Sequence, residues 1–372
     1  MTSDNPVELD GPAGDTGAAP FSLSLTVVFV ARGSFVNIRK TLECLLRQNA
    51  ASLIEFIFST DSPTLLREAE AFVVEKGSFA RARFLLQEEK SIASARRLAA
   101  MEARTDVVGF VEDHAFPGWN WAEELLAAFE SSENIVAAAP VMRNPNQESA
   151  ISRAQFLLSH GVHDQRSESC RFLDSRLLPW HSTAYRRNRL LAEVREVGAF
   201  EVESFLLENI RKANPGARFV LCTRCSVHHV NMTRWVPALR HAFHGGRVFG
   251  AERCRWLGWN PWSRAARAAS FPVVALLKIR RSASLMPDHA SLSRWLATLA
   301  TVLPLATLHA FGEAWGTCFG KGRSPEINKE FEVDRRPCMR RADWHYILAD
   351  ADQATKQSSR VLEVAERHNL CH

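Results

Sequence analysis

Two acidic residues and a histidine stand next to one another directly after an apolar run. The segment reads GFVEDHAFPGW over residues 109–119, so Glu112, Asp113 and His114 follow a stretch with the pattern of a buried strand. Two carboxylates this close repel each other unless a cation lies between them. A divalent cation held by oxygen ligands and one imidazole would relieve the repulsion and remain open to a diphosphate. The simpler alternative is that the acids stabilise the N-terminus of a helix that begins near Trp119.

Strands and helices are predicted to alternate around this cluster. Apolar, β-branched runs predict strands at 23–31, 53–59, 82–87, 106–112 and 134–142. Apolar residues at helical spacing predict helices at 37–48, 62–76, 91–103, 119–130 and 201–216. Strands that are apolar throughout are typical of a parallel sheet covered by helices on both faces, an α/β fold. Ligands of such sheets bind beyond the carboxyl ends of the strands, where the acidic cluster, Arg32 and Asp61 all fall.

The composition is that of a globular protein, with 46% hydrophobic and 23% charged residues. Residues 1–22 are rich in Gly, Pro, Asp and Ala and are predicted to be a flexible segment, without the pattern of a secretory signal. The eight cysteines are scattered along the chain. Their spacing is not that of a disulfide framework, which favours a reducing compartment.

A basic and aromatic stretch lies between residues 231 and 287, where we count ten Lys or Arg, one acid and four Trp. This combination suits an anionic membrane surface or a nucleic acid. The apolar stretch 296–311 that follows is shorter than the roughly 20 residues of a membrane span, and Thr, Pro and His interrupt it. It predicts helices that lie in the membrane interface, and it favours a membrane over a nucleic acid as partner.

With these elements in place, the chain resembles the family-2 glycosyltransferases of the GT-A fold from about Leu23 to Trp259. The resemblance implies a GT-A domain over 23–260, membrane-associating helices over 261–320 and a polar C-terminal tail over 321–372, with a helix expected near 350–367. The D-x-D motif of the family is E-D-H here. Glu112 and His114 therefore stand at its outer positions and, with Asp113, would hold a divalent metal (Mn or Mg) and the diphosphate. Because an imidazole replaces one anion, a lower metal affinity or a preference for manganese is expected.

Further matches imply contacts with the nucleotide and the donor sugar. The sequence ARG at 31–33, the acid after the second strand and the segment SARRLA resemble nucleotide-binding positions of the family, which implies roles for Ala31, Arg32, Asp61 and Arg96. The segment WHSTAYRRNRLL resembles the one that places the sugar, with His181 and Ser182, and Trp119 belongs to a PGW also found in relatives. Arg97 stands where the family usually has Asn.

The catalytic base of the family is an acid at the start of a helix, and FEVESFL offers Glu201 and Glu203. Two residues apart, they project from different helix faces, and Glu203 fits the following leucines better. Helix-start acids also simply favour the helix dipole. The segments HHVN and HGGRVFGAER resemble the part that closes over the diphosphate, which implies contacts from His229 and Arg247. For Arg247, lipid headgroup binding is an equal alternative.

The resemblance implies an inverting glycosyltransferase that moves a sugar from a nucleotide-diphosphate-sugar donor to a glycan, lipid or other acceptor. We expect it in the cytoplasm, at the inner face of the inner membrane. The altered metal motif leaves a second hypothesis open, a catalytically inactive member that acts as a nucleotide-sugar sensor or membrane scaffold. A nucleic-acid-binding protein is disfavoured by the apolar segment 296–311, so no nucleic-acid partner is expected.

Overall fold

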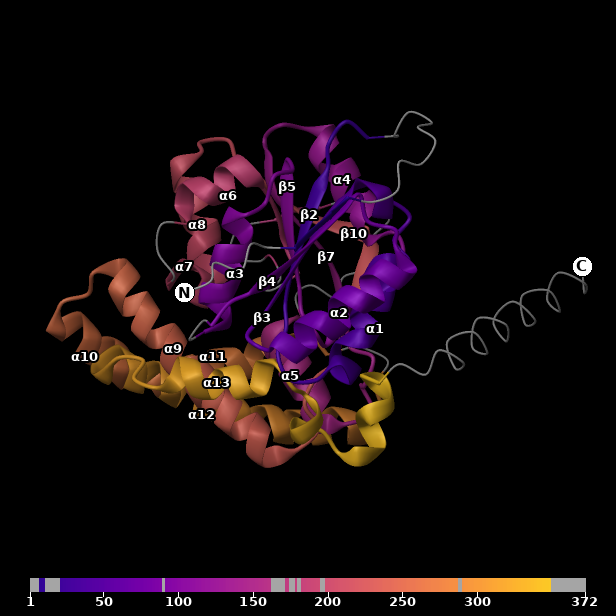
Figure 1. Cartoon of the computed structure of the whole chain (residues 1–372). Coiled ribbons are helices and arrows are strands. Elements are labelled where there is room, and N and C mark those ends of the chain that lie inside the picture. The colour runs from indigo at the N-terminus through magenta and orange to yellow at the C-terminus, as the bar shows by residue number, and fades with distance from the viewer. Residues whose placement is uncertain are drawn as a thin grey trace, which may run out of the picture.

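The structure, a computed structural model, describes residues 7–10, 21–88, 91–161, 171–173, 178, 182–194, 198–286 and 290–348. A curved β-sheet is covered by helices, and a further group of helices, α9 to α13, packs below it in the view of Figure 1. The helix expected near 350–367 lies outside the described residues.

The sheet is mostly parallel, as predicted. Its order is β1-β4-β3-β2-β5-β9-β7-β10-β6, and β8 pairs with β10. Six strands run in one direction: β2 (Leu25–Val30), β3 (Ile54–Thr60), β4 (Arg81–Leu86), β5 (Val107–Val111), β7 (Ile135–Arg143) and β10 (Arg218–His229). Four short strands run against their neighbours: β1 (Val7–Asp10), β6 (Ala115–Pro117), β8 (Arg171–Leu173) and β9 (Ala184–Arg186). The insertion of β9 between β5 and β7 was not predicted.

Eight α-helices lie between the described strands; four of them confirm the helices predicted at 37–48, 62–76, 91–103 and 119–130, whereas those at 150–159 and 187–193 were not predicted. The eight are α1 (Phe35–Leu46), α2 (Pro63–Lys76), α3 (Ile92–Met101), α4 (Trp121–Ser131), α5 (Ala150–Ser159), α6 (Arg187–Glu193), α7 (Gly198–Glu201) and α8 (Glu203–Ala213). The Ser62 and Ser91 hydroxyls cap α2 and α3 by accepting backbone N–H bonds from Leu65 and Ser94. The single helix predicted at 201–216 is instead two helices that break at Val202.

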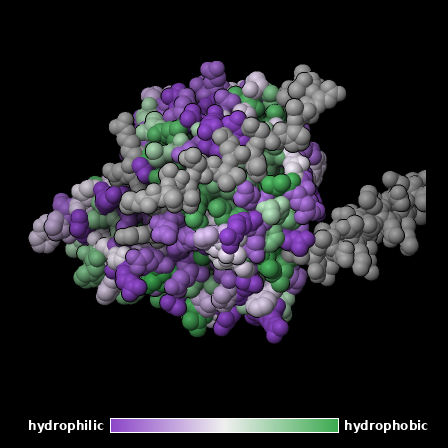
Figure 2. Space-filling view, viewed as in Figure 1, coloured by the Kyte–Doolittle hydropathy of each residue, from purple (hydrophilic) through white to green (hydrophobic). Residues whose placement is uncertain are grey.

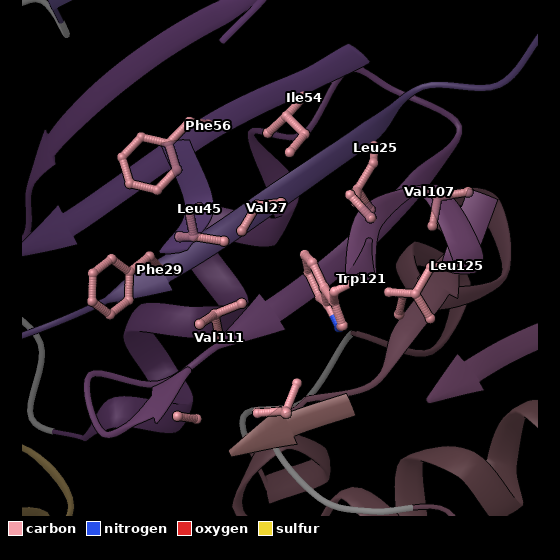
Figure 3. Close-up of a cluster of buried hydrophobic side chains, with 14 of the residues drawn as sticks. Leu25, Val27, Phe29, Leu45, Ile54, Phe56, Val107, Val111, Trp121 and Leu125 are labelled. Atoms are coloured by element: carbon pink, nitrogen blue, oxygen red, sulfur yellow. The ribbon is translucent and has the colours of Figure 1, made fainter. Parts of the chain in front are cut away.

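The core lies on both faces of the sheet because alternate residues of each buried strand point to opposite sides. On β2, Val27 and Phe29 belong to one apolar cluster, while Val28 and Val30 belong to the other. Figure 3 shows the first cluster, in which Trp121 of α4 packs close to the strands. This two-sided burial explains why the strands read as continuous apolar runs.

The C-terminal helices are α9 (Trp235–Leu257), α10 (Pro261–Ala269), α11 (Phe271–Ser284), α12 (Leu292–Phe319) and α13 (Ser324–Glu332), followed by two 3-10 turns at Arg336–Cys338 and Arg341–Tyr346. Glycines allow α9 and α12 to touch backbone to backbone. A Cβ at Gly250 would lie 2.0 Å from the Glu313 carbonyl oxygen, and one at Gly316 would lie 2.0 Å from that of Arg247. Larger residues would force the two helices apart.

Among the described residues, α12 is the single helix long and apolar enough to cross a membrane. The sequence predicts interrupted helices in this region, whereas the structure has one continuous helix through Pro304. The polar residues that suggested interruption are accommodated within it, since the Thr298 and Thr301 hydroxyls donate to carbonyls one turn earlier. One side of α12 packs on α9, α11 and α5.

Candidate active site

A cavity of about 880 Å³ lies between the carboxyl edge of the sheet and the C-terminal helices. At the sheet end its wall includes Glu112, which follows β5, and His229, the last residue of β10. Residues of α3, α5 and α7 to α13 form the rest. The cavity therefore lies where the parallel sheet predicts a ligand.

Three metal-ligating side chains converge at the sheet end of this cavity. The Nε2 atoms of His229 and His114 lie 3.4 and 3.5 Å from Oε2 of Glu112, and all three side chains are buried. Strand pairing brings them together, because β6 runs antiparallel to β10 with Ala115 opposite His229. One atom from each of the three residues lies within 4.8 Å of the others, which makes them a candidate metal site.

The chemistry of these donors fits a transition-metal cation. Donor atoms bound to one cation at about 2.1 Å lie about 3.0 to 3.5 Å apart, as the Glu112–histidine distances do. The Nδ1 atom of His114 lies 2.6 Å from Oδ1 of Asp113. A carboxylate in this position holds the ring with a proton on Nδ1 and leaves the Nε2 lone pair for a cation, as is usual for metal-binding histidines.

A guanidinium already faces that lone pair. Nη2 of Arg335 lies 2.7 Å from Nε2 of His114, and both side chains are buried. A metal ligated by Nε2 would use the same lone pair, so Arg335 and such a metal exclude one another at this atom. Arg335 lies in the segment predicted to be only a polar tail. No pattern in the sequence indicates that this segment returns to the sheet, because Arg335 and His114 are more than two hundred residues apart in the chain.

Arginine also balances the acid of the cluster. Nη2 of Arg96 lies 3.1 Å from Oε1 of Glu112. Burial alone would lower the pKa of Arg96, but Glu112, Glu203 and Glu332 raise it, so the guanidinium stays charged. Burial raises the pKa of Asp113 well above its ordinary value, against the opposing effect of Arg335. The sheet end thus contains a dense, nearly balanced set of charges.

The two candidate bases lie in different surroundings. Glu203 is 3% exposed, and the Tyr185 hydroxyl donates to its Oε1 at 3.1 Å. Burial, together with Glu203, raises the pKa of Tyr185 well above its ordinary value, so the phenol remains a donor. Glu201 instead lines the cavity, and burial raises the pKa of its carboxyl although Lys321 opposes this effect.

The predicted nucleotide-binding residues lie along the same edge of the sheet. Arg32 and Asp61 form an ion pair with each other beyond β2 and β3, and the backbone N–H of Ala31 donates to the Ser59 carbonyl. Lys329 of α13 lies 3.6 Å from Asp61 and also lines the cavity. Among the predicted nucleotide-binding residues, Arg96 lines the cavity, whereas Ala31, Arg32 and Asp61 do not.

Trp119 and Arg247 also lie outside the cavity wall. Trp119 is 63% exposed, because β6 carries the chain away from the cluster before α4 begins. Arg247 donates to the Gly320 carbonyl at the end of α12 and takes no part in the cavity wall. Ser182 is buried, and its hydroxyl has no hydrogen-bond partner among the described residues. His181 lies outside the described residues.

The helical end of the cavity was missed by sequence reasoning. Four residues of the basic stretch line it: Arg253, Arg267, Lys278 and Arg281. The sequence shows the excess of basic residues but not the direction in which their side chains point. The basic stretch was therefore predicted to face a membrane, whereas these four residues face the cavity. His160 was also missed. Its ring lies 4.6 Å from that of His229, between centroids.

The described residues thus combine a mixed α/β fold with a candidate metal site at the carboxyl edge of its sheet. The family model described as Glycosyl transferase family 2 matches residues 26–190, which lie within the part of the chain predicted to resemble that family. No curated protein sequence matches the chain.

Among solved structures, the chain is similar to three glycosyltransferase structures at low identity. For mannosyltransferase PcManGT from Pyrobaculum calidifontis, in complex with GDP-Man and Mn²⁺, identity is 14% and the TM-score 0.46, over 85% of this chain and 92% of that one. For S. aureus TarS, identity is 12% and the TM-score 0.45, over 71% of this chain and 50% of that one. For GalNAc-T7 with UDP, GalNAc and Mn²⁺, identity is 14% and the TM-score 0.39, over 56% of this chain and 43% of that one. The chain thus spans half or less of the last two.

Proposed function

We propose that this protein transfers a sugar from a nucleotide-diphosphate-sugar donor to an acceptor in the cavity, with a divalent metal held by Glu112, His114 and His229 once the Arg335 guanidinium has moved away from Nε2 of His114. The observation that carries the proposal is the convergence of these three donors, two of which, Glu112 and His229, line the cavity, next to the part of the chain that the family-2 model matches. A bound divalent metal would supply positive charge to the departing diphosphate. Two imidazoles in the donor set favour manganese over magnesium, which prefers an all-oxygen shell.

The chain itself supplies further groups for the same step. Asp113 holds the His114 ring in the tautomer that presents Nε2. Arg96, buried beside Glu112, remains charged and adds a planar donor suited to phosphate oxygens. Arg32 and Asp61 lie beyond neighbouring strands, where the nucleoside of the donor would bind. The arrangement suits direct displacement at the anomeric carbon, which inverts its configuration and needs a carboxylate to accept the acceptor's proton.

Glu201 is the better-placed base, although the sequence favours Glu203. A base must touch the acceptor, and Glu201 lines the cavity whereas Glu203 is covered and hydrogen-bonded by Tyr185. Burial also raises the pKa of Glu201 toward the range in which a carboxylate accepts protons efficiently. Glu203 then acts on Arg96, whose charge it helps to maintain.

The matched variants E201Q and E203Q test this assignment. E201Q is expected to lower kcat of transfer by about 10² to 10⁴-fold while leaving the Kd of the donor within about twofold, because an amide cannot accept the proton. E203Q should retain most turnover, since its amide oxygen still accepts from Tyr185. Loss of transfer in E203Q with full activity in E201Q would assign the base to Glu203 instead.

The proposed activity itself is tested by a panel of nucleotide sugars in the presence and absence of Mn²⁺. Titration calorimetry is expected to detect one donor that binds more tightly with the metal, and a product assay should detect transfer or slow hydrolysis of that donor. Donor binding without any turnover would support the inactive sensor or scaffold. We place the protein at the cytoplasmic membrane surface, supported by exposed apolar side chains on α10 to α12 such as Trp262 and Leu276.

A further inference from the structure

The helical end of the cavity carries an excess of positive charge. Arg253, Arg267, Lys278 and Arg281 line it, and Glu313 of α12 is the acid among them. Both Arg253 and Arg267 reach the same carboxylate oxygen of Glu313, Arg267 at 2.5 Å. One carboxylate therefore serves two guanidinium groups and cannot balance the remaining cations.

Lys278 and Arg281 project from α11 one turn apart, and neither side chain has a hydrogen-bond or ion-pair partner within the described part of the chain. Burial lowers the pKa of Lys278; Glu313 opposes this effect, and the neighbouring arginines add to it. Lys278 is partly buried near Arg253 and Arg267, whereas Arg281 is exposed, and an anion bound here would offset the repulsion among these cations. The charge and geometry at this end are those of an anion-binding site, and guanidinium with ammonium groups suits a phosphate.

Apolar side chains surround the mouth of the cavity next to these cations. Leu277 both lines the cavity and is 58% exposed, so it lies at the opening, one turn from Arg281. Its neighbours on the same helix, Val273 and Leu276, are also more than half exposed. Trp262 on α10 and Leu296 and Leu303 on α12, the two helices that contact α11, are also exposed. Hydrophobic and hydrophilic residues alternate over the lower part of the face in Figure 2.

We propose that the helical end of the cavity binds the phosphate-bearing headgroup of a lipid acceptor, whose chains lie against the exposed apolar residues of α10 to α12. A phosphate would balance the charge of these cations, and acyl or similar chains would cover the exposed apolar residues near the mouth. The inference rests on the proposed function, because it identifies the headgroup as the acceptor that meets the donor sugar. A neutral soluble glycan would leave both features without a partner.

The test is binding of dioctanoyl phosphatidic acid below its micelle concentration, measured by titration calorimetry. Glycerol 3-phosphate supplies the headgroup alone, and dioctanoyl phosphatidylcholine supplies the same chains without net charge. We expect phosphatidic acid to bind at least about tenfold more tightly than either. Equal binding of glycerol 3-phosphate would mean a soluble phosphate ligand, and equal binding of phosphatidylcholine would mean that the cations play no part. Either result overturns the proposal.

The double variant K278Q/R281Q should weaken phosphatidic acid binding at least about tenfold. The control R67Q/R189Q removes the same charge from exposed positions of α2 and α6 and should leave binding unchanged. Equal binding by wild type and K278Q/R281Q would overturn the assignment of the site. Nucleotide-sugar binding with Mn²⁺, measured on the same proteins, is expected to be unaffected by either double variant. Its absence in the wild type would instead reject the proposed function.

Discussion

The two ends of one cavity differ in their balance of charge and are built by different means. At the sheet end, Glu112, His114 and His229 meet through strand ends and the β6–β10 pairing. At the helical end, cations from α9 to α11 gather around Glu313 of α12. The comparison teaches that strand register brings the three metal donors within 4.8 Å of one another, whereas a helical wall depends on how closely its helices approach.

The largest effect is expected from a substitution that separates α9 from α12. A Cβ at Gly250 would lie 2.0 Å from the Glu313 carbonyl oxygen, so G250A must separate the helices that form the cationic wall. We expect it to lower the free energy of unfolding by about 3 kcal/mol, the upper range of overpacking effects. Urea denaturation followed by circular dichroism measures the change.

The same helix offers a matched control. Gly245 has nothing within 4 Å of its added Cβ, and alanine favours a helix over glycine by about 0.5 to 1 kcal/mol. G245A should therefore be as stable as the wild type or slightly more so. Equal stability of G250A and G245A would mean that the close approach of α9 and α12 does not hold the helical end together.

A smaller effect is expected from the charge at that end. Burial lowers the pKa of Lys278 in the folded protein. Below the ordinary pKa of lysine, the unfolded chain therefore binds the Lys278 proton more tightly than the folded chain does, and this difference destabilises the fold. At neutral pH, K278Q should raise the Tm slightly. As pH rises from the lowered pKa toward the ordinary value of 10.5, the unfolded chain binds more protons than the folded one. Wild-type stability therefore increases relative to K278Q, and the advantage of the variant shrinks.

Thermal melts of both proteins between pH 7 and pH 10 measure this difference. Arginines remain protonated throughout that range, so the change can be attributed to Lys278 rather than to its cationic neighbours. A Tm difference that stays constant over the range, or a K278Q variant less stable than wild type at pH 7, would contradict an uncompensated charge at the helical end.

Much of the sheet end follows from local sequence. Apolar runs give the main strands to within a few residues, and Ser62 and Ser91 mark the helix starts that the structure contains. Because the carboxyl ends of parallel strands share one edge, Glu112, Arg32 and Asp61 were expected along that edge, and they follow β5, β2 and β3. These features depend on periodicity and on one topological rule, both visible without a structure.

What was not predictable depends on contacts between distant segments. Arg335 reaches His114 through a chain reversal that no local pattern encodes. The direction in which Lys278 and Arg247 point depends on the rotation of α9 and α11 about their axes, which glycine contacts with α12 help to set. Composition therefore identified a basic segment but could not divide it between a cavity wall and an outer surface.

The most direct test of the account is Mn²⁺ binding by the wild type, H229A and H228A, followed by electron paramagnetic resonance of free Mn²⁺. His229 is buried at the cluster, whereas His228, its neighbour on β10, is exposed on the other face of the strand. We predict that the wild type and H228A bind one Mn²⁺ with the same affinity and that H229A binds it at least about tenfold more weakly. Unchanged Mn²⁺ affinity in H229A, or equal losses in both variants, would contradict a metal held at the edge of the sheet.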